Sequence, residues 1–586
     1  MEVLKFFMPF VGLSGTWQAI LIILLFPMCL TQNLRAHPIF PNVPYLWVWN
    51  APTEYCTKNH KVPLDLSVFS LVGSPQKNIK GQSIRIFYSD RLGKYPYVDS
   101  DNVTWHGGIP QAVKLQEHLE QAKKDIVHYL PNNDIGLAII DWQEWRPLWI
   151  RNWDHKDIYR QMSIQSVHRK SPSLDATTVN NTAKADFENA AKQFLLETLK
   201  LGKLLRPKRY WGYYLFPDCY NHHYTNAGYD GRCFDIEVKR NDELSWLWNE
   251  STALYPSIYL NTKLKSSRLG TLFSRNRIQE AIRVSKSQNA MNPLPVFVYT
   301  RPVFTDASWN FLSEFDLVST IGESVSLGAS GNILWGSLNF SQSKESCTTL
   351  DNYMKTILVP YIINVSLAAK MCSQVLCYSQ GLCARKNWDS DHYLHLNASN
   401  FYIEYGHCKT FAVTGEPTLA DLYYFIDKFD CSCFSNVTCK MRKKLENLDV
   451  INVCIGENIC IGTQIKEKLA RNRSKWKERF YKSFNNVSSS VSPAKMSPCA
   501  SGKDISECLK VRCSVEAVSN NAQEGCQNVN WINTSNQLYI QNEENEADSS
   551  TSSILLIFPV NILFVLYLFY KRETDVFVKQ GKKKNT

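Results

Sequence analysis

Short apolar runs recur along residues 36–350, and this pattern limits the possible folds more than any other feature of the chain. Six runs have the length of buried strands: Ile84–Tyr88, Gly136–Trp142, Tyr210–Phe216, Tyr255–Leu260, Leu294–Thr300 and Gly331–Gly336. Apolar residues at three- and four-residue spacing predict helices between some of them, at Phe187–Leu205 and Arg275–Ser287. Buried strands that alternate with helices are typical of a parallel α/β sheet or barrel.

Polar and aromatic residues stand where several of these strands end. Asp141, Tyr214, Tyr259 and Trp335 all fall at or just past a predicted strand end. In a closed parallel barrel, the functional side chains lie at the carboxyl ends of the strands. We therefore expect these four residues to lie around one site.

The segment Gly136–Trp153 carries the most chemical information. On a regular strand, Asp141 and Gln143 would share one face, whereas Trp142 and Glu144 would point to the other. Two carboxyl groups at this spacing would converge, and a glycosidase uses such a pair as an acid and a charged stabiliser. Here the partner of Asp141 is an amide. In a purely structural role, Asp141 would cap the following turn.

Cysteines crowd into residues 372–460, where long apolar runs are few. This composition predicts a small module held together by disulfides. A zinc site is the alternative, but an exported chain without paired Cys-x-x-Cys motifs argues against it. The nine cysteines are Cys372, Cys377, Cys383, Cys408, Cys431, Cys433, Cys439, Cys454 and Cys460.

Both ends of the chain indicate export to a membrane. Lys5 followed by the apolar run Ala19–Leu30 predicts a secretory signal peptide, cleaved near residues 33–36. Ile554–Tyr570 would span roughly 25 Å as a helix, and the basic residues behind it predict a cytoplasmic tail. A lipid-anchor signal is the alternative, although its apolar tail normally ends the chain. Ten glycosylation sequons fit an exported protein: Asn102, Asn180, Asn249, Asn339, Asn364, Asn397, Asn436, Asn472, Asn486 and Asn533.

A basic stretch and a polar stalk precede the predicted span. Residues 465–482 contain eight Lys or Arg against two Glu, so they form either a solvated linker helix or a cationic helix that lies on a polyanion or membrane. Residues 483–552 are rich in Ser, Asn and Glu and predict a disordered stalk. It contains Cys499, Cys508, Cys513 and Cys526.

Several long motifs resemble the hyaluronidase family of glycosyl hydrolases. They are VWNAPTEYC, IFYSDRLGKYPY, GGIPQ, YWGYYLFPDCYNHHY, RNDELSWLWNESTALYPSIYLNT, IGESVSLGASG and LAAKMCSQVLC, and the resemblance runs from about Phe40 to Cys460. It implies a distorted parallel (β/α) barrel of the TIM type, an EGF-like module, no cofactor or metal, and substrate-assisted retaining cleavage of hyaluronan or chondroitin. The resemblance is strongest to members found on mammalian sperm, which implies the sperm plasma or acrosomal membrane.

The resemblance also implies roles for single residues. Asp141 would polarise the substrate acetamido group, Tyr214 and Tyr259 would hydrogen-bond the reacting sugar, and Trp335 would pack behind its methyl group. Tyr88, Arg146 and Asp218 would line the groove. The implied disulfides are Cys56–Cys347, Cys219–Cys233, Cys372–Cys383, Cys377–Cys431, Cys433–Cys439 and Cys454–Cys460, which leaves out Cys408 and the stalk cysteines.

The chain departs from the family motif at the proton donor. The motif has Asp-Trp-Glu, whereas this chain has Asp141-Trp142-Gln143. An amide has no proton to release at ordinary pH. Two hypotheses follow: a hyaluronan-binding surface protein with weak or lost cleavage, or an active hyaluronidase in which Glu144 or water replaces the acid. The net charge of +11 suits a polyanionic ligand in either case, and no nucleic-acid motif is present.

These inferences divide the chain into six parts. They are a signal peptide (1–35), a hyaluronidase barrel (36–365), a cysteine-rich EGF-like module (366–460), a basic segment and stalk (461–552), a transmembrane helix (553–570) and a cytoplasmic tail (571–586).

Overall fold

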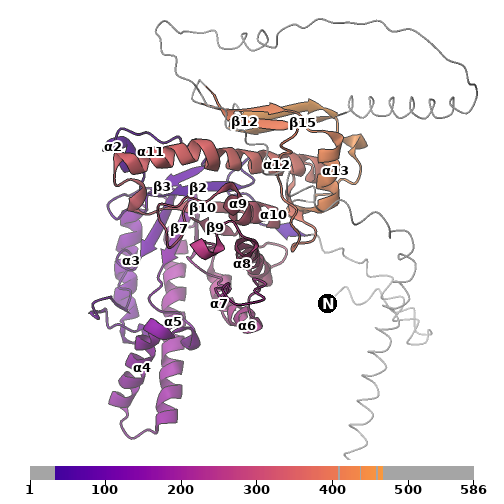
Figure 1. Ribbon diagram of the computed structural model, residues 1–586. Coiled ribbons are helices and arrows are strands. Elements are labelled where there is room, and N and C mark those ends of the chain that lie inside the picture. The colour runs from indigo at the N-terminus through magenta and orange to yellow at the C-terminus, as the bar shows by residue number, and fades with distance from the viewer. Residues whose placement is uncertain (1–32, 407–409, 436, 438, 457–458, 466–586) are drawn as a thin grey trace, which may run out of the picture. The chain divides into compact units, whose positions relative to one another are not determined.

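The computed structural model describes residues 33–465, apart from 407–409, 436, 438 and 457–458 (Figure 1). Most of the signal peptide, nearly all of the basic segment, the stalk, the predicted span and the tail lie outside these residues, as does Cys408. Leu34–Arg35, at the end of the predicted signal peptide, form strand β1, which pairs with Cys433 and Phe434.

Seven strands form two parallel sheets at the centre of the fold. The first has the order β3-β2-β10-β9 and the second has the order β4-β7-β8. Their bounds are β2 Leu46–Asn50, β3 Leu71–Gly73, β4 Ile84–Tyr88, β7 Gly136–Asp141, β8 Arg209–Tyr213, β9 Phe297–Thr300 and β10 Gly331–Trp335. All pairings within both sheets are parallel. The predicted parallel α/β class is confirmed.

Residues 254–257 connect the two sheets on one side through isolated parallel bridges, such as Tyr214 with Tyr255 and Ser257 with Tyr299. On the other side β3 packs closely on β4, since a Cβ atom on Gly73 would lie 2.5 Å from Ile84 Cγ2. No ladder joins β3 to β4 among the described strands. The hydrogen-bonded pairing therefore does not close into a complete barrel.

Alternate residues along the strands point into two different clusters. Leu137 and Ile139 of β7 join Ile84 in a cluster enclosed by the strands. Ala138 and Ile140 belong to the larger core on the opposite faces, where the helices pack. This two-residue alternation fixes which side chains reach the interior at the strand ends.

Helices follow most of the central strands. Their bounds are α2 Glu54–Lys58, α3 Leu115–Tyr129, α4 Asp157–Lys170, α5 Ala176–Leu205, α6 Asp235–Glu243, α7 Ser245–Glu250, α8 Arg268–Ser287, α9 Glu314–Leu317, α10 Glu323–Leu327, α11 Lys344–Tyr353, α12 Val359–Cys377 and α13 Leu419–Lys428. The two predicted helices lie inside α5 and α8. Asp175 begins α5 by accepting bonds from the N–H groups of Thr177 and Thr178.

Five of the six predicted strands are present, but the prediction of a strand at Tyr255–Leu260 is wrong. This segment makes isolated bridges only. Pro256 has no N–H with which to continue a ladder, so the segment passes between β8 and β9 without regular pairing.

The long helical stretch Lys344–Cys377 is apolar enough to cross a membrane, but 72% of its most apolar window is buried within the protein. In Figure 1 this stretch lies between the central strands and the hairpins of the C-terminal part. Lys370 Nζ donates to the carbonyl of Cys454 (2.7 Å), and the N–H of Asn452 donates to Gln374 Oε1 (3.1 Å). The helix is therefore a core element that connects both parts.

Short strands and disulfides make up the C-terminal part. The strands are β11 Gly381–Arg385, β12 Phe401–Tyr405, β13 Phe411–Gly415, β14 Phe429–Phe434, β15 Val450–Ile455 and β16 Ile459–Gln464. Four disulfides lie in or border this part, namely Cys372–Cys383, Cys377–Cys431, Cys433–Cys439 and Cys454–Cys460, and Cys56–Cys347 and Cys219–Cys233 lie outside it. These six pairs are the ones that the family resemblance implies. Cys431, Cys433 and Cys439 lie close together, but each is already in a disulfide and offers no thiolate to a metal.

Candidate active site

The carboxyl ends of the parallel strands bring the predicted site residues together. Tyr88 ends β4 and is in register with Asp141 at the end of β7. Trp335 ends β10, and Tyr214 follows β8 directly. Tyr88, Tyr214, Tyr259 and Trp335 all pack as half-buried side chains against the cluster that the strands enclose. Four different segments therefore contribute to one aromatic surface beside Asp141.

Asp141 and Gln143 converge, although β7 ends at Asp141. The Gln143 amide Nε2 donates a hydrogen bond of 2.6 Å to Asp141 Oδ1. Trp142, between them, points the other way and stacks on Tyr95 with ring centroids 4.6 Å apart. The amide therefore lies beside Asp141, at the position where the resemblance leads us to expect a glutamic acid.

The Asp141 carboxyl resists ionisation. Burial raises its pKa to about 7, and the nearby Glu144 carboxylate acts in the same direction. The hydrogen bond from Gln143 and the charge of Arg146 act against this rise. Near neutral pH, Asp141 therefore exists in both protonation states.

The Glu144 carboxylate is engaged with the backbone. Its Oε2 accepts a hydrogen bond of 3.0 Å from the backbone N–H of Gln143. This hydrogen bond holds the Glu144 carboxylate on the backbone beside the Asp141–Gln143 pair.

Two cations bind the backbone carbonyls of Gln143 and Glu144. Arg146 Nη1 donates to the Gln143 carbonyl at 2.8 Å. Lys156 Nζ donates to the carbonyls of Gln143 (2.5 Å) and Glu144 (3.1 Å), and burial lowers its pKa to about 8. Lys156 was not predicted as a site residue, because it lies 13 positions from Gln143 and 12 from Glu144 and reaches them only in the folded chain.

Three aromatic rings lie next to one another in the site. Tyr214 and Tyr259 lie 6.2 Å apart, Tyr259 and Trp335 lie 6.3 Å apart, and the latter pair is stacked. The Tyr214 hydroxyl is hydrogen-bonded to Tyr259 and Ser257, and burial raises its pKa well above the usual value. Trp335 Nε1 donates to the Tyr88 hydroxyl at 3.2 Å. Protonated phenols and an indole face therefore line the site.

Arg301 is a second residue that the sequence analysis missed. It follows β9 by one position, and its guanidinium lies 5.1 Å from the Trp335 ring and 5.7 Å from the Tyr259 ring. Its position just past a strand end is the signal that identified the other site residues and could have identified Arg301.

Asp218, which was expected to line the groove, is a buried residue. It is buried, and its Oδ1 pairs with Arg277 Nη2 at 2.7 Å. Burial acts to raise its pKa, but Arg277 and the N–H of Tyr220 hold the pKa below the usual value. Asp218 therefore stays ionised and orders the loop that follows β8.

The described sequons differ in accessibility. Asn102, Asn180, Asn249 and Asn397 are exposed, whereas Asn339 and Asn364 are half-buried. Asn339 Nδ2 donates to Ser308 Oγ (3.1 Å), and Asn364 Oδ1 accepts from the N–H of Leu396 (3.0 Å). The four exposed positions are the more accessible to a glycosylating enzyme.

Comparison with known proteins identifies the family. The sequence profile described as "Hyaluronidase" matches residues 34–445. Human "Hyaluronidase PH-20" is 57% identical over 471 residues, which cover 80% of this chain and 92% of that protein. The chain belongs to the hyaluronidase family.

Further hyaluronidases show the same relationship. Mouse "Hyaluronidase-5" is 52% identical over 507 residues, covering 86% of this chain and 96% of that protein. The crystal structure of bee venom hyaluronidase is 28% identical with a TM-score of 0.47, and the match covers 54% of this chain and 99% of the bee chain.

Proposed function

We propose that this chain is a hyaluronan-binding member of the hyaluronidase family whose cleavage of the polysaccharide is weak or lost. The observation that carries the proposal is the 2.6 Å bond from the Gln143 amide to Asp141. An amide can hydrogen-bond a glycosidic oxygen but cannot protonate it. General-acid help is worth about 10²–10⁴-fold in rate, so its loss leaves a binding site with poor chemistry.

The remaining residues suit the family mechanism. In the substrate-assisted reaction, the acetamido oxygen of the sugar attacks its own anomeric carbon. Asp141 would polarise that acetamido group, and the Tyr214 and Tyr259 hydroxyls would hydrogen-bond the reacting sugar. Trp335 would pack against the acetamido methyl, while Tyr88, Arg146 and Asp218 would support the groove.

Active hydrolysis is the alternative, and it needs an acid other than Gln143. Glu144 is the nearest candidate in sequence, but its carboxylate is bonded to the N–H of Gln143. To protonate the glycosidic oxygen, Glu144 would have to give up this bond. The alternative is therefore less well supported by the geometry.

We infer that the two parallel sheets act as one distorted barrel, with the site at the carboxyl ends of its strands. The cysteine-rich part would be an EGF-like module of residues 366–460. A signal peptide and the predicted span Ile554–Tyr570 would place the protein on the cell surface. Similarity to PH-20 hyaluronidases favours the sperm surface.

Binding and turnover measured on the same purified full-length chain test the proposal. We expect hyaluronan decasaccharides to bind, with a rate of new reducing ends at least about 10²-fold below that of an active PH-20 hyaluronidase assayed in parallel. Comparable turnover would refute the loss of catalysis, and an absence of binding would refute the proposed ligand.

A further inference from the structure

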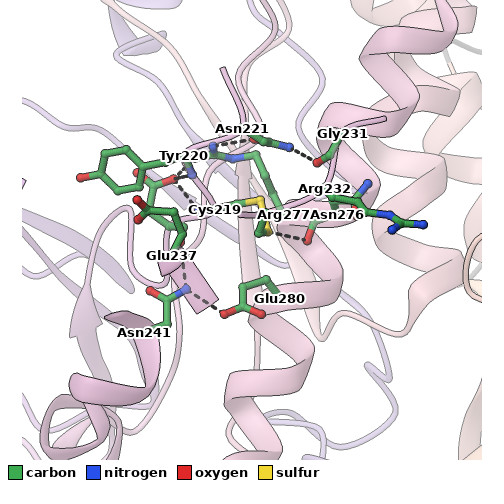
Figure 2. Close-up of a disulfide and its surroundings, with 12 residues drawn as sticks. Cys219, Tyr220, Asn221, Gly231, Arg232, Glu237, Asn241, Asn276, Arg277 and Glu280 are labelled. Atoms are coloured by element: carbon green, nitrogen blue, oxygen red, sulfur yellow. Dashed lines mark hydrogen bonds and ion pairs between the residues drawn. A yellow bond between two sulfur atoms is a disulfide. The ribbon is translucent and has the colours of Figure 1, made fainter. Parts of the chain in front are cut away.

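Three arginines line a small cavity next to the candidate active site. The cavity has a volume of about 20 Å³, and its walls include Arg146, Arg151 and Arg240 together with Tyr220 and Asn241. Arg146 is also bonded to the Gln143 carbonyl, so the cavity adjoins the loop that carries the family's acid position. Figure 2 shows Tyr220, Glu237 and Asn241 beside the Cys219–Cys233 disulfide.

Arg151 is the most unusual member of this group. Its side chain is 94% buried, yet Nε and Nη1 have no hydrogen-bond partner among the described residues. The guanidinium stacks on the Tyr220 ring at 3.5 Å, and Nη2 pairs with Glu237. Buried donors without partners are costly, so their place against a cavity suggests that a ligand completes them.

Positive charge exceeds negative charge around the cavity. Glu237 is shared by Arg151 and Arg240, whose Nη1 lies 2.5 Å from Glu237 Oε1, and Asp218 is paired with Arg277. Arg146 has no ion pair within the described part of the chain. The lining residues thus include three guanidinium groups and one carboxylate, that of Asp218, and burial lowers the pKa of Arg151 to about 10. An added anion would balance the excess charge.

The cavity size limits what can enter. A volume of about 20 Å³ holds one water-sized group and excludes a sugar ring. A carboxylate attached to a ring that stays in the groove could insert one oxygen. Guanidinium groups suit planar oxyanions, since they donate parallel hydrogen bonds.

We propose that this cavity is a carboxylate subsite that takes a uronate group of a polysaccharide bound in the groove, with Arg151 as its main donor. The inference rests on the proposed function, since the ligand must first occupy the groove. It explains why Arg151 is buried with free donors and why arginines gather here.

The test compares two forms of one ligand on the purified full-length chain at fixed ionic strength. One is a hyaluronan decasaccharide, and the other is the same oligomer with its carboxylates reduced to alcohols. The variants are Arg151→Met and Arg240→Met. Arg232→Met is the matched control, since it removes one positive charge from an exposed side chain that does not line the cavity.

We expect Arg151→Met to weaken binding of the native oligomer by about 10-fold or more, in line with loss of a charge-assisted hydrogen bond. Binding of the reduced oligomer should change by less than about 2-fold, and Arg232→Met should leave both affinities unchanged. The inference is overturned if a folded Arg151→Met chain binds the native oligomer as wild type does, or loses both ligands equally.

If Arg151→Met does not fold, Arg240→Met decides by the same two criteria. A wild-type chain that binds neither oligomer overturns the proposed function as well as this subsite. Wild-type binding that is insensitive to both cavity variants overturns the subsite alone.

Discussion

The Gln143 amide and the Asp141 carboxylate lie 2.6 Å apart at the end of β7, a geometry that strand alternation alone predicts. Strand alternation could not predict that Lys156 and Arg151 lie near the site, because their positions depend on the path of the chain after β7. At this scale, sequence reasoning finds residues that the local backbone positions and misses those positioned by tertiary packing.

Asp141 gives a prediction about stability and pH. Its pKa is about 7 in the folded protein against 3.8 as the reference value. Between pH 4 and 7 the folded state therefore binds more protons than the unfolded state, and the free energy of unfolding falls as pH rises. Asp141→Asn should remove this penalty and raise the free energy of unfolding at pH 8 by up to about 4 kcal/mol, with little change at pH 4. Denaturant unfolding of wild type and Asp141→Asn at both pH values measures this change. An equal change at pH 4 and pH 8 would contradict the raised pKa of Asp141.

At the scale of elements, prediction worked where local pattern decides the structure. Five short apolar runs became strands and two amphipathic stretches became helices. Tyr255–Leu260 failed because Pro256 interrupts its pairing. α12 was not predicted, because a helix buried on nearly all sides lacks an amphipathic pattern.

A buried charge network joins helices α8 and α10, which pack beside the parallel sheets, to the C-terminal part. Glu323 in α10 accepts hydrogen bonds from Arg275 Nη2 (2.8 Å), Arg385 Nη1 (3.0 Å) and the Tyr393 hydroxyl (2.6 Å). The Glu323, Arg275 and Arg385 side chains are fully buried. Removal of the shared carboxylate charge leaves the buried Arg385 without its ion pair, whereas Arg275 keeps Asp389 and Asp391.

Glu323→Gln should therefore lower the free energy of unfolding by about 3–5 kcal/mol, the usual cost of breaking a buried ion pair. Glu345→Gln in α11 is the control, because Glu345 is exposed and should give a change within about 0.5 kcal/mol. Chemical denaturation measures both. Equal stability of the two variants would show that the network adds nothing.

The Cys56–Cys347 disulfide joins residues separated by 291 positions. A crosslink over so long a loop is worth on the order of 5 kcal/mol in the chain-entropy treatment. The double substitution of both residues by serine should reduce secretion and lower the thermal midpoint. Normal secretion with an unchanged midpoint would show that the disulfide is dispensable.

For the whole molecule, the sequence predicts a surface protein held by the helix Ile554–Tyr570. The polar tail behind this segment favours a true span over a lipid anchor. Treatment of intact cells with a phosphatidylinositol-specific phospholipase should leave the protein on the cells, and a lipid-anchored protein on the same cells serves as the control. Release into the medium would contradict the span.

We propose that one amide separates this chain from an active hyaluronidase. Gln143→Glu should place a carboxyl beside Asp141 at little packing cost, and repulsion between the two carboxyls should keep one of them protonated, as a general acid requires. The decisive measurement is the rate of hyaluronan cleavage by wild type, Gln143→Glu and Glu144→Gln chains prepared in parallel. We predict a gain of at least about 10²-fold for Gln143→Glu, with similar affinity for oligomers and little effect of Glu144→Gln. Brisk cleavage by wild type that Glu144→Gln abolishes would contradict the account and identify Glu144 as the acid.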